Sequence, residues 1–536
     1  MPKSLFHNTG KYIRFILRRE RVYIITWIVL LFVITICQAQ SFGDLYPTQA
    51  DRQIVAESMS NPAMVAIMGK TYGKENYTLG ALMSQQTLLF TVVATAIMNI
   101  LFINRNLRGD EEAGRIELVR SRAIGKLFNI SAAIIVSIGM NVMLSVLIGA
   151  GLGSLNMESM DLKGSMLFGT ALGASGFMFA AITAFINQLF TNAKGALGFS
   201  FGILGFSYFV RAIGDIGNEN IAMISPLGWV MRTQVYVKNI IWPIMLLIGV
   251  AIILLVLAIW INNKRNLGAG IFHERSGRDS ASAFLRTPLE LVVKILRMEY
   301  FVWIIVYIVL GLSFGAMMNE IKIQMESNEM LLQILACDPK DGDLLYQFIN
   351  IITSIFAMIT TIPVITTIVK VRNEEVSNRI ECLISKAITR RKLLSAFFFC
   401  AIFISVVLQL VFAVSFWCSA NQVIEGTAVD MGDMLKTACV YIPAIWIMAG
   451  LGIAVIGLIP NKIIIVWIFF AYSFFVKYFG AMLDLDEWII KISPYGNVSN
   501  VMADGMEWKK LIVLLVISIF LTVLGYIGYR RRDLQV

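Results

Sequence analysis

The chain has 536 residues, of which 57% are hydrophobic and 15% are charged, and its mean hydropathy is +0.74. Soluble domains carry about 25% charged residues, so this composition excludes an ordinary soluble protein and predicts an all-α, polytopic membrane protein. The net charge of +10 comes from lysines and arginines that flank apolar runs, which is typical of membrane proteins and does not indicate nucleic-acid binding.

Apolar runs of about 20 residues, the length that crosses a hydrocarbon core of about 30 Å, recur along the whole chain. We predict about twelve spans. They cover residues 22–41, 81–103, 127–149, 164–187, 196–213, 240–261, 300–318, 346–369, 393–417, 437–459, 463–483 and 511–528. The first run begins after residue 21 and is too long for a signal-peptide core, so we expect no cleavable signal. Basic clusters beside the spans place both termini in the cytoplasm.

The segment between the first two spans contains "MVAIMGKTYGK" (64–74), which includes a Gly-Lys-Thr sequence. A phosphate-binding loop needs glycine five positions before the first of these residues, and that position is Met64. The segment also falls on the predicted outer side, away from cytosolic ATP. We therefore predict part of an amphipathic outer helix and no nucleotide site. The cysteines show no ligand spacing either, and we expect no metal.

A charged sequence, "RGDEEAGRIELVRSRAIGK" (108–126, the first cassette), separates the second and third spans. Its apolar residues Ile116, Val119 and Ala123 recur at helical spacing, and Glu111 precedes Arg115 by four residues, the favourable order for a helical ion pair. We predict a short amphipathic helix that projects into the cytoplasm. The alternative is a solvated connecting loop.

The second half of the chain repeats these features in the same order. The second cassette, "RNEEVSNRIECLISKAITRRK" (372–392), carries a matching apolar stripe at Ile380, Leu383 and Ala387. The other matches are "ILRRE" (16–20) with "ILRME" (295–299), "YFVRAIG" (208–214) with "FFVKYFG" (474–480), "ISPLG" (224–228) with "ISPYG" (492–496), and "KRNLG" (264–268) with "RRDLQ" (531–535).

We infer a six-span unit that is duplicated head to tail, which gives two parallel repeats. The predicted organisation is a first half at 1–261 with an N-terminal interfacial helix, a cytoplasmic linker with a second interfacial helix at 262–297, and a second half at 298–536. Two equivalent cassettes imply that both dock to the same kind of surface on a two-fold partner.

The first cassette, and above all its "EEAGRIELV", resembles the coupling helix of ABC export permeases. Over essentially its whole length the chain is similar to the putative polyketide-antibiotic exporters of the tetronasin-resistance type, whose permeases are fused twelve-span chains. The second cassette departs from the pattern, with Ser377 and Asn378 in place of Ala113 and Gly114.

This resemblance implies a permease subunit of an ATP-driven exporter in the bacterial plasma membrane, not an enzyme itself. It would extrude hydrophobic or amphipathic, antibiotic-like compounds and confer resistance by efflux. The implied partners are two copies of a cytosolic ABC ATPase, which would bind ATP and Mg, besides membrane lipids; the chain itself would hold no cofactor. The implied ATPase-docking residues are Asp110, Glu111, Glu112, Arg115, Glu117, Glu374, Glu375, Arg379 and Glu381.

Two other classes of function compete with this interpretation. A twelve-span, ion-coupled secondary transporter usually needs an ionisable group within the membrane, and no Asp or Glu falls inside a predicted span. A membrane-embedded enzyme would need a cluster of catalytic groups, whereas His7 and His273 stand without a partner pattern.

The resemblance places the fifth and eleventh spans among those that line the substrate pathway. Their aromatic faces suit an apolar cargo, and contact with lipid is the alternative. Arg211 and Lys477 are expected to snorkel to the outer interface or to capture an anionic substrate. The candidate pathway residues are Phe201, Phe206, Phe209, Arg211, Trp467, Phe470, Phe474 and Lys477. Gly169, Gly173 and Gly176 in the fourth span indicate close helix packing.

Overall fold

The computed structural model describes residues 5–121, 124–270, 285, 287–319, 344–376, 389–423, 429–479, 486–499 and 505–532. All regular elements in these residues are helices. The chain forms two compact units, unit 1 at Met1–Gly277 and unit 2 at Arg278–Val536. The predicted all-α membrane fold is confirmed, because eleven of the described helices are long and apolar enough to cross a membrane.

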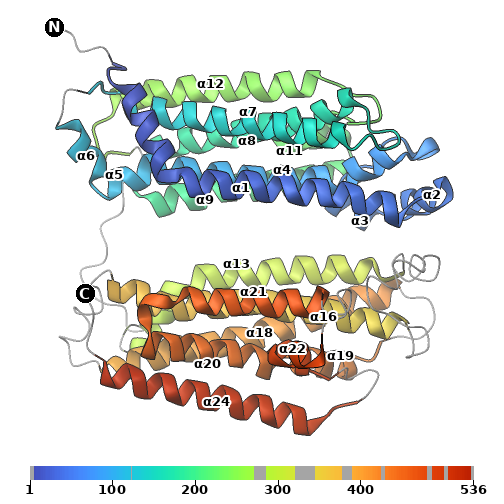
Figure 1. Cartoon of the computed structure of the whole chain (residues 1–536), viewed down its shortest axis with the longest axis vertical. Coiled ribbons are helices and arrows are strands. Elements are labelled where there is room, and N and C mark those ends of the chain that lie inside the picture. The colour runs from blue at the N-terminus through green and yellow to red at the C-terminus, as the bar shows by residue number, and fades with distance from the viewer. Residues whose placement is uncertain are drawn as a thin grey trace. The chain divides into compact units, whose positions relative to one another are not determined.

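Unit 1 is a bundle of long helices that run side by side (Figure 1). These are α1 (Thr9–Leu45), α4 (Leu79–Asn104), α7 (Phe128–Ser154), α8 (Leu162–Leu189), α9 (Ala193–Ile216) and α12 (Trp242–Lys264). Helix α8 is the centre of the bundle and packs against α4, α7, α9 and α12. The peripheral helices α1 and α12 bury only a minority of their apolar residues within the unit, as a lipid-facing surface requires.

Glycines allow α8 to lie close to α7. A Cβ on Gly169 would lie 2.2 Å from the Ser145 carbonyl oxygen, and one on Gly173 would lie 2.8 Å from the Asn141 carbonyl oxygen. Because lipid offers no hydrophobic drive for helices to associate, such close backbone contact is a main source of packing energy in a membrane. The predicted role of these glycines in close helix packing is therefore confirmed.

Short helices cover the end of unit 1 that lies away from the first cassette. They are α2 (Gln49–Ser58), α3 (Pro62–Met68), η1 (Lys74–Asn76), α10 (Glu219–Ala222) and α11 (Pro226–Met231). The Gly-Lys-Thr sequence follows α3, where Gly69 ends the helix in the left-handed region at φ 99°. Glycine adopts this conformation without the steric penalty that a side chain would impose.

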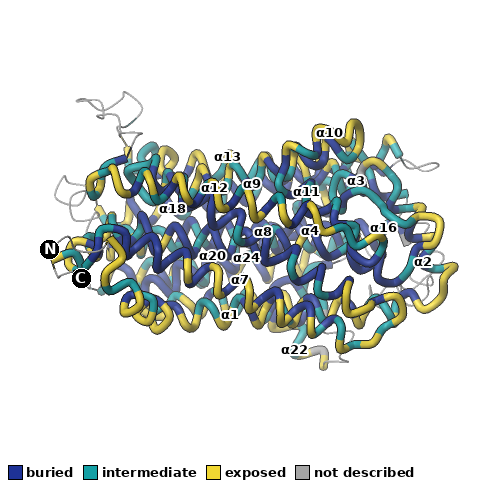
Figure 2. Tube along the Cα trace, turned by 90° about the horizontal axis from the view of Figure 1, so that it is seen from above, coloured by how far each residue is buried: buried dark blue, intermediate teal, exposed yellow. Residues whose placement is uncertain are grey.

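Unit 2 contains a second bundle, in which α16 and α20 are the most buried spans. Its long helices are α13 (Pro288–Ala316), α16 (Leu344–Val376), α18 (Arg390–Val423), α19 (Met431–Cys439) with α20 (Ile442–Leu458), α21 (Ile464–Phe479) and α24 (Trp508–Arg531). The short elements η4 (Pro460–Lys462), α22 (Glu487–Ile492) and η5 (Pro494–Asn497) connect them. Figure 2 shows exposed positions along outer helices such as α1 and α13 and buried ones along α8 and α20.

The predicted spans differ from the observed helices mainly at their ends. Helix α21, the predicted eleventh span, is apolar but falls short of the length that the other spans reach within the described residues. The predicted interfacial segments are the first turns of α1 and α13, with no break before the span, although these turns of α1 lie at an angle to the rest (Figure 1). The helices also extend beyond the apolar runs, so that Glu20 and Asp215 lie within helices although they fall outside the predicted spans 22–41 and 196–213.

Candidate functional site

The first cassette does not form one continuous helix. After α4 the chain makes a π-helical turn, η2 (Arg105–Gly109), then one turn of helix, α5 (Asp110–Glu112), and after a break α6 (Arg115–Arg120). The break lies at Gly114, whose φ of 69° is left-handed. The predicted Glu111–Arg115 pair is therefore wrong, because the two residues lie on different helices and bond to other partners.

Glu111 instead joins the end of the second span to the chain that follows the sixth. Arg108 Nη1 donates to Glu111 Oε2 at 2.6 Å, and Arg265 Nη1 donates to the same oxygen at 3.0 Å. The Glu111 side chain is only 6% exposed. Arg108 and Arg265 also both donate to the Ala269 carbonyl oxygen, each at 3.0 Å. We call Arg108, Glu111 and Arg265 the first clamp.

Asp110 forms a second buried junction beside the first clamp. Arg19 of α1 donates to both of its carboxylate oxygens, at 3.1 and 2.8 Å, and Arg115 Nε donates to it at 2.8 Å. The neighbouring Glu20 is also buried and pairs with Arg19 at 2.9 Å and with Arg105 at 3.3 Å. Removing one member would leave a buried charge unpaired, which costs far more than the loss of a surface ion pair.

Glu112 has a different intramolecular role. Its Oε2 accepts a hydrogen bond from the backbone N–H of Ala193, at the start of α9, at 2.8 Å. A carboxylate at a helix N-terminus satisfies a free N–H group and interacts favourably with the helix dipole. Three of the residues expected to dock a partner, Asp110, Glu111 and Glu112, are thus bonded within unit 1.

The described part of the predicted apolar stripe of the first cassette also faces inward, whereas Ala123 lies outside the described residues. Ile116 is buried in the core of unit 1, and Val119 packs against that core. The opposite face of α6 presents Glu117 and Leu118 outward, and Leu118 is 75% exposed, the highest value among the large hydrophobic side chains in the described residues. The face of α6 that points away from the core therefore carries Leu118 and not the predicted apolar stripe.

The second cassette begins with the same arrangement. Glu375, only 2% exposed, accepts hydrogen bonds from Arg372 at 3.2 Å and from Arg532 at 2.6 Å. We call Arg372, Glu375 and Arg532 the second clamp. Glu374 lies beside it at the end of α16. Arg379 and Glu381, with the apolar stripe of this cassette, lie outside the described residues.

Sequence reasoning missed the clamp arginines as partners of the glutamates, although a signal was present. Arg108 and Arg372 occupy matching positions of the two cassettes. Arg265 and Arg532 occupy matching positions of "KRNLG" and "RRDLQ". A repeated arginine after each sixth span is more than a basic flank requires, because a flank specifies charge but no exact position.

The candidate pathway residues fall into two groups by exposure. Phe206 and Phe209 of α9 and Phe474 of α21 are exposed on the apolar surface, where cargo or lipid can reach them. By contrast, Phe201, Trp467 and Phe470 pack against the cores of their own units. The structure thus supports a packing role for Phe201, Trp467 and Phe470. Among these aromatic residues, Phe206, Phe209 and Phe474 are the ones exposed to an apolar molecule.

Arg211 neither snorkels nor stays available for a substrate. Its guanidinium is fully buried and donates to the carbonyl oxygens of Val65 at 3.2 Å and Ala66 at 2.7 Å, near the end of α3. It also pairs with Asp215 at 3.2 Å and lies 4.6 Å from the centroid of the Tyr208 ring. Arg211 therefore anchors the short helix α3 to α9. Lys477, its counterpart on α21, is half-buried, and within the described residues no hydrogen bond or ion pair is formed by its ammonium group.

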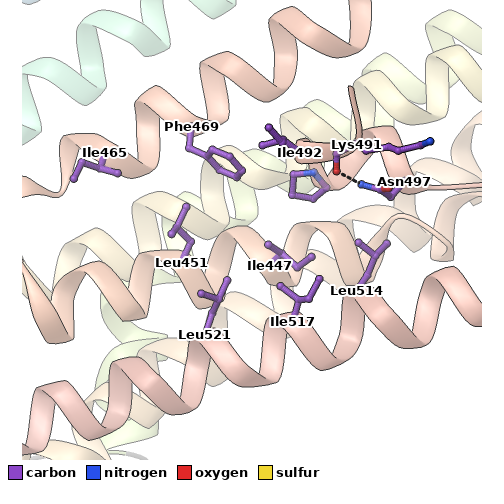
Figure 3. Close-up of a pocket in the computed structure, with 11 residues that line it drawn as sticks. Ile447, Leu451, Ile465, Phe469, Lys491, Ile492, Asn497, Leu514, Ile517 and Leu521 are labelled. Atoms are coloured by element: carbon purple, nitrogen blue, oxygen red, sulfur yellow. Dashed lines mark hydrogen bonds between the residues drawn. The ribbon is translucent and has the colours of Figure 1, made fainter. Parts of the chain in front are cut away.

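Apolar hollows lie on the surface of each unit. In unit 2, a hollow of about 290 Å³ opens between α20, α21 and α24, where Phe469, Leu451 and Ile517 line it (Figure 3). One end is polar, because Asn497 Nδ2 donates to the Lys491 carbonyl oxygen at 2.6 Å there. In unit 1, a hollow of about 320 Å³ lies between the outer ends of α8 and α12. Hollows of this kind suit hydrocarbon, either of lipid or of an apolar compound.

Comparison with known proteins places this architecture in a family. The family described as "Multidrug efflux system permease Rv1217c, C-terminal domain" matches residues 11–261 and 285–530 of this chain. The chain belongs to this family. It is also 28% identical to the multidrug efflux system permease protein Rv1217c of Mycobacterium tuberculosis (strain ATCC 25618 / H37Rv), over 99% of this chain and 96% of that protein. Membership supports the predicted role of a membrane-bound efflux permease.

Proposed function

We propose that this permease is the membrane subunit of an ATP-driven exporter of the ABC class. Two copies of a separate cytosolic ATPase dock on its two cassettes and hydrolyse ATP with Mg. The cargo is a hydrophobic or amphipathic, antibiotic-like compound, as in exporters of the tetronasin-resistance type. In this proposal the chain lies in the bacterial plasma membrane with both termini in the cytoplasm, and the transport confers resistance.

The observation that carries this proposal is the exposure of Leu118 outside the spans. An apolar side chain held in water forgoes a burial free energy of about 2 kcal/mol. Helix α6 presents this residue beside the exposed Glu117, while the opposite face of the helix is held by Ile116 in the core. In this proposal the exposed leucine of the short, charged helix α6 inserts into an apolar groove of the partner.

The buried ion pairs below α6 support a mechanical role. The first clamp connects the base of the cassette to the end of α12, and Arg19 connects it to α1. A force applied at α6 therefore reaches several spans through short, charge-assisted hydrogen bonds. Because the second clamp repeats this arrangement in unit 2, we propose one docking position in each unit and thus two ATPases per chain.

The assignment of ATP binding to a partner agrees with the structure of the Gly-Lys-Thr segment. Here α3 and Gly69 form a helix end, and Lys70 forms an ion pair with Glu219 of α10. This backbone is held against Arg211 through the carbonyl groups of Val65 and Ala66. The lysine and the preceding backbone thus take part in the packing of the short outer helices.

The test is co-purification of this chain with its candidate ATPase after Leu118→Asp. We expect the wild-type chain to bring down two ATPase copies and the variant to lose at least the copy on unit 1, together with stimulated ATP hydrolysis. Ile224→Asp is the matched control, because Ile224 is 68% exposed at the opposite end of unit 1. Unchanged ATPase binding by the Leu118 variant, with two copies retained, would contradict the proposal.

An ion-coupled carrier is the second candidate, and Asp215 is the observation that favours it. This carboxylate lies in α9 and pairs with the buried Arg211. Such pairs occur in proton relays of membrane transporters. Purified permease in vesicles without any ATPase would then move an efflux dye when only a proton gradient is imposed, and Asp215→Asn would abolish that movement. Transport that requires ATP and the ATPase excludes this candidate.

A further inference from the structure

Arg211 and Lys477 occupy matching positions in the repeated sequences "YFVRAIG" and "FFVKYFG", yet their surroundings differ. The guanidinium of Arg211 is engaged by two backbone carbonyl groups, a carboxylate and an aromatic ring. The ammonium of Lys477 has no such partner in the part of the chain that the structure describes. Within the described residues, the two units thus hold one cation with internal partners and one without them at matching sequence positions.

The sequence explains why the compensation is missing in unit 2. Asp215, one residue after "YFVRAIG", corresponds to Ala481, so the counter-charge is replaced by a methyl group. Tyr208, whose ring lies against Arg211, corresponds to Phe474. Phe474 is 44% exposed on the apolar surface of α21. Both differences keep the cation and lack the carboxylate and the hydroxyl found at the matching positions of unit 1.

A second polar group without a partner lies on the same side of α21. Ser473 is fully buried, and its hydroxyl forms no hydrogen bond in the structure. It precedes Lys477 by four residues, so the two side chains lie one above the other on one helix face. A hydroxyl donor and an ammonium donor at this spacing are complementary to the oxygens of one acidic group.

The end of α21 that carries these groups is held in place. Tyr472 donates to the Ile489 carbonyl oxygen of α22 at 2.9 Å, and the hydroxyls of Tyr478 and Ser354 of α16 lie 2.9 Å apart. The other end of α21 follows Asn461, which bonds to Arg372 beside the second clamp. Lys477 therefore lies at the end of its span away from the cassettes, on a preorganised helix.

We propose that Lys477 and Ser473 bind the acidic headgroup of an amphipathic anion, whose apolar body lies along the exposed face of α21 at Phe474. An ammonium group that is half-buried among apolar side chains is costly, and an anion that pairs with it recovers part of that cost. Unit 1 satisfies the same position internally and binds no such anion there. Binding itself does not depend on the proposed coupling to ATP; its use in export rests on the proposed function.

The test is a binding measurement on the purified permease in neutral detergent, without ATPase or ATP. The probes are the anionic dye 1-anilinonaphthalene-8-sulfonate and its uncharged relative N-phenyl-1-naphthylamine. We expect Lys477→Met to weaken binding of the anion by roughly tenfold, since one charge-assisted hydrogen bond is lost, and to leave the neutral dye unchanged. Lys477→Arg should keep the affinity for the anionic dye, and Ser473→Ala should weaken that affinity by about threefold.

Lys509→Met is the matched control, because it removes an exposed lysine at the start of α24, outside the residues that line the hollow. Equal affinity of wild-type and Lys477→Met protein for the anionic dye would overturn the proposal, and so would equal loss of both dyes. If Lys477→Met cannot be purified, Lys477→Gln and Ser473→Ala decide by the same criterion. Displacement of the dye by phosphatidylglycerol but not by phosphatidylcholine identifies a lipid as the natural anion. If neither lipid displaces the anionic dye, and its binding still depends on Lys477, the natural anion is a transported compound.

Discussion

The two units are alike where the cassettes begin and unlike within the membrane. At the cassette end, each unit holds one buried glutamate between an arginine three residues earlier and an arginine that follows the last span. These are Arg108, Glu111 and Arg265 in unit 1, and Arg372, Glu375 and Arg532 in unit 2. The two units thus form the same buried ion-pair arrangement at these six positions, as the proposed docking of one ATPase on each unit requires.

The interiors of the two helix bundles are connected by different side-chain hydrogen bonds. In unit 1, Asn99 and Asn141 exchange side-chain hydrogen bonds at 2.9 and 2.8 Å, and Ser137 donates to Asn99 at 2.8 Å. The position that matches Asn99 in unit 2 is Pro363, which lies inside α16 and cannot donate a backbone hydrogen bond. Similar ends with different interiors are what the proposed function requires, if both units couple to an ATPase and each contributes its own surface to the pathway.

Unit 2 contains a different hydrogen-bond network, in which one buried acceptor is not used. Gln409 Nε2 donates to Thr360 at 2.8 Å, and Tyr307 bonds to the same threonine at 2.8 Å. The Gln409 Oε1 is buried without a hydrogen-bond partner in the structure. The Asn99–Asn141 pair is therefore held by reciprocal bonds, whereas the network around Gln409 keeps an unused acceptor.

The largest expected effect comes from breaking a clamp. Glu111→Leu leaves Arg108 and Arg265 as buried, unpaired cations, and we expect a loss of about 3–5 kcal/mol of stability. Glu375→Leu should cost a similar amount if the two clamps are equivalent. Thermal unfolding of the purified variants measures both. Glu117→Leu, at an exposed position of the same cassette, should change stability by less than about 0.5 kcal/mol. If the Glu111 variant is as stable as this control, the first clamp does not contribute to the stability of unit 1.

The next effect tests the contrast between Arg211 and Lys477. Arg211→Met leaves Asp215 without its partner and frees the carbonyl groups at the end of α3, so we expect a loss of about 3 kcal/mol or more. Lys477→Met removes an uncompensated cation and should leave the unfolding temperature unchanged or raise it. The same thermal assay compares the two variants. A large loss of stability in Lys477→Met would mean that this lysine has an internal structural partner after all.

A smaller effect is expected from the membrane interiors. Asn99→Ala removes the reciprocal amide bonds and leaves Asn141 unsatisfied, at a cost of about 1–2 kcal/mol. Gln409→Leu in unit 2 should cost less than about 0.5 kcal/mol, because its acceptor is already unused and Thr360 keeps Tyr307. Unfolding of the purified variants at increasing concentrations of a denaturing detergent measures both losses of stability. Equal losses of stability in the two variants would show that the asparagine pair and the Gln409 network contribute alike.

The smallest effect concerns pH at the short outer helices of unit 1. The hydrogen bond from Lys70, together with the charge of Arg232, lowers the pKa of Glu219 below its usual value. A lowered pKa in the folded state adds stability above the usual carboxyl pKa of about 4.3, and this stability is lost as pH falls through that value and below. Glu219→Gln should abolish this small acid-side loss. An identical pH profile in the wild type and the variant would show that the pair contributes nothing.

Much of the architecture could be predicted from the sequence. Hydrophobic length alone locates the spans, because about 20 apolar residues are needed wherever a helix crosses a bilayer. The repeated motifs at matching positions also pointed to the clamp region, since two copies of an unusual charge pattern are unlikely to arise by chance. The prediction went wrong where a local rule competed with distant partners, as at Glu111. Its four-residue spacing from Arg115 favoured a helical pair, but an arginine 154 positions away holds the carboxylate.

Composition, span length and the repeated charge pattern were thus determined by the sequence itself, because each depends on neighbouring residues and on the thickness of a bilayer. The tertiary structure decided which face of each element is used. A left-handed Gly114 turns α6 so that Ile116 enters the core and Leu118 faces outward. The pairing of Arg211 with α3, and the absence of such a pair for Lys477 in the described residues, likewise depend on segments far apart in the chain. Only folding brings such groups within the few ångströms over which hydrogen bonds act.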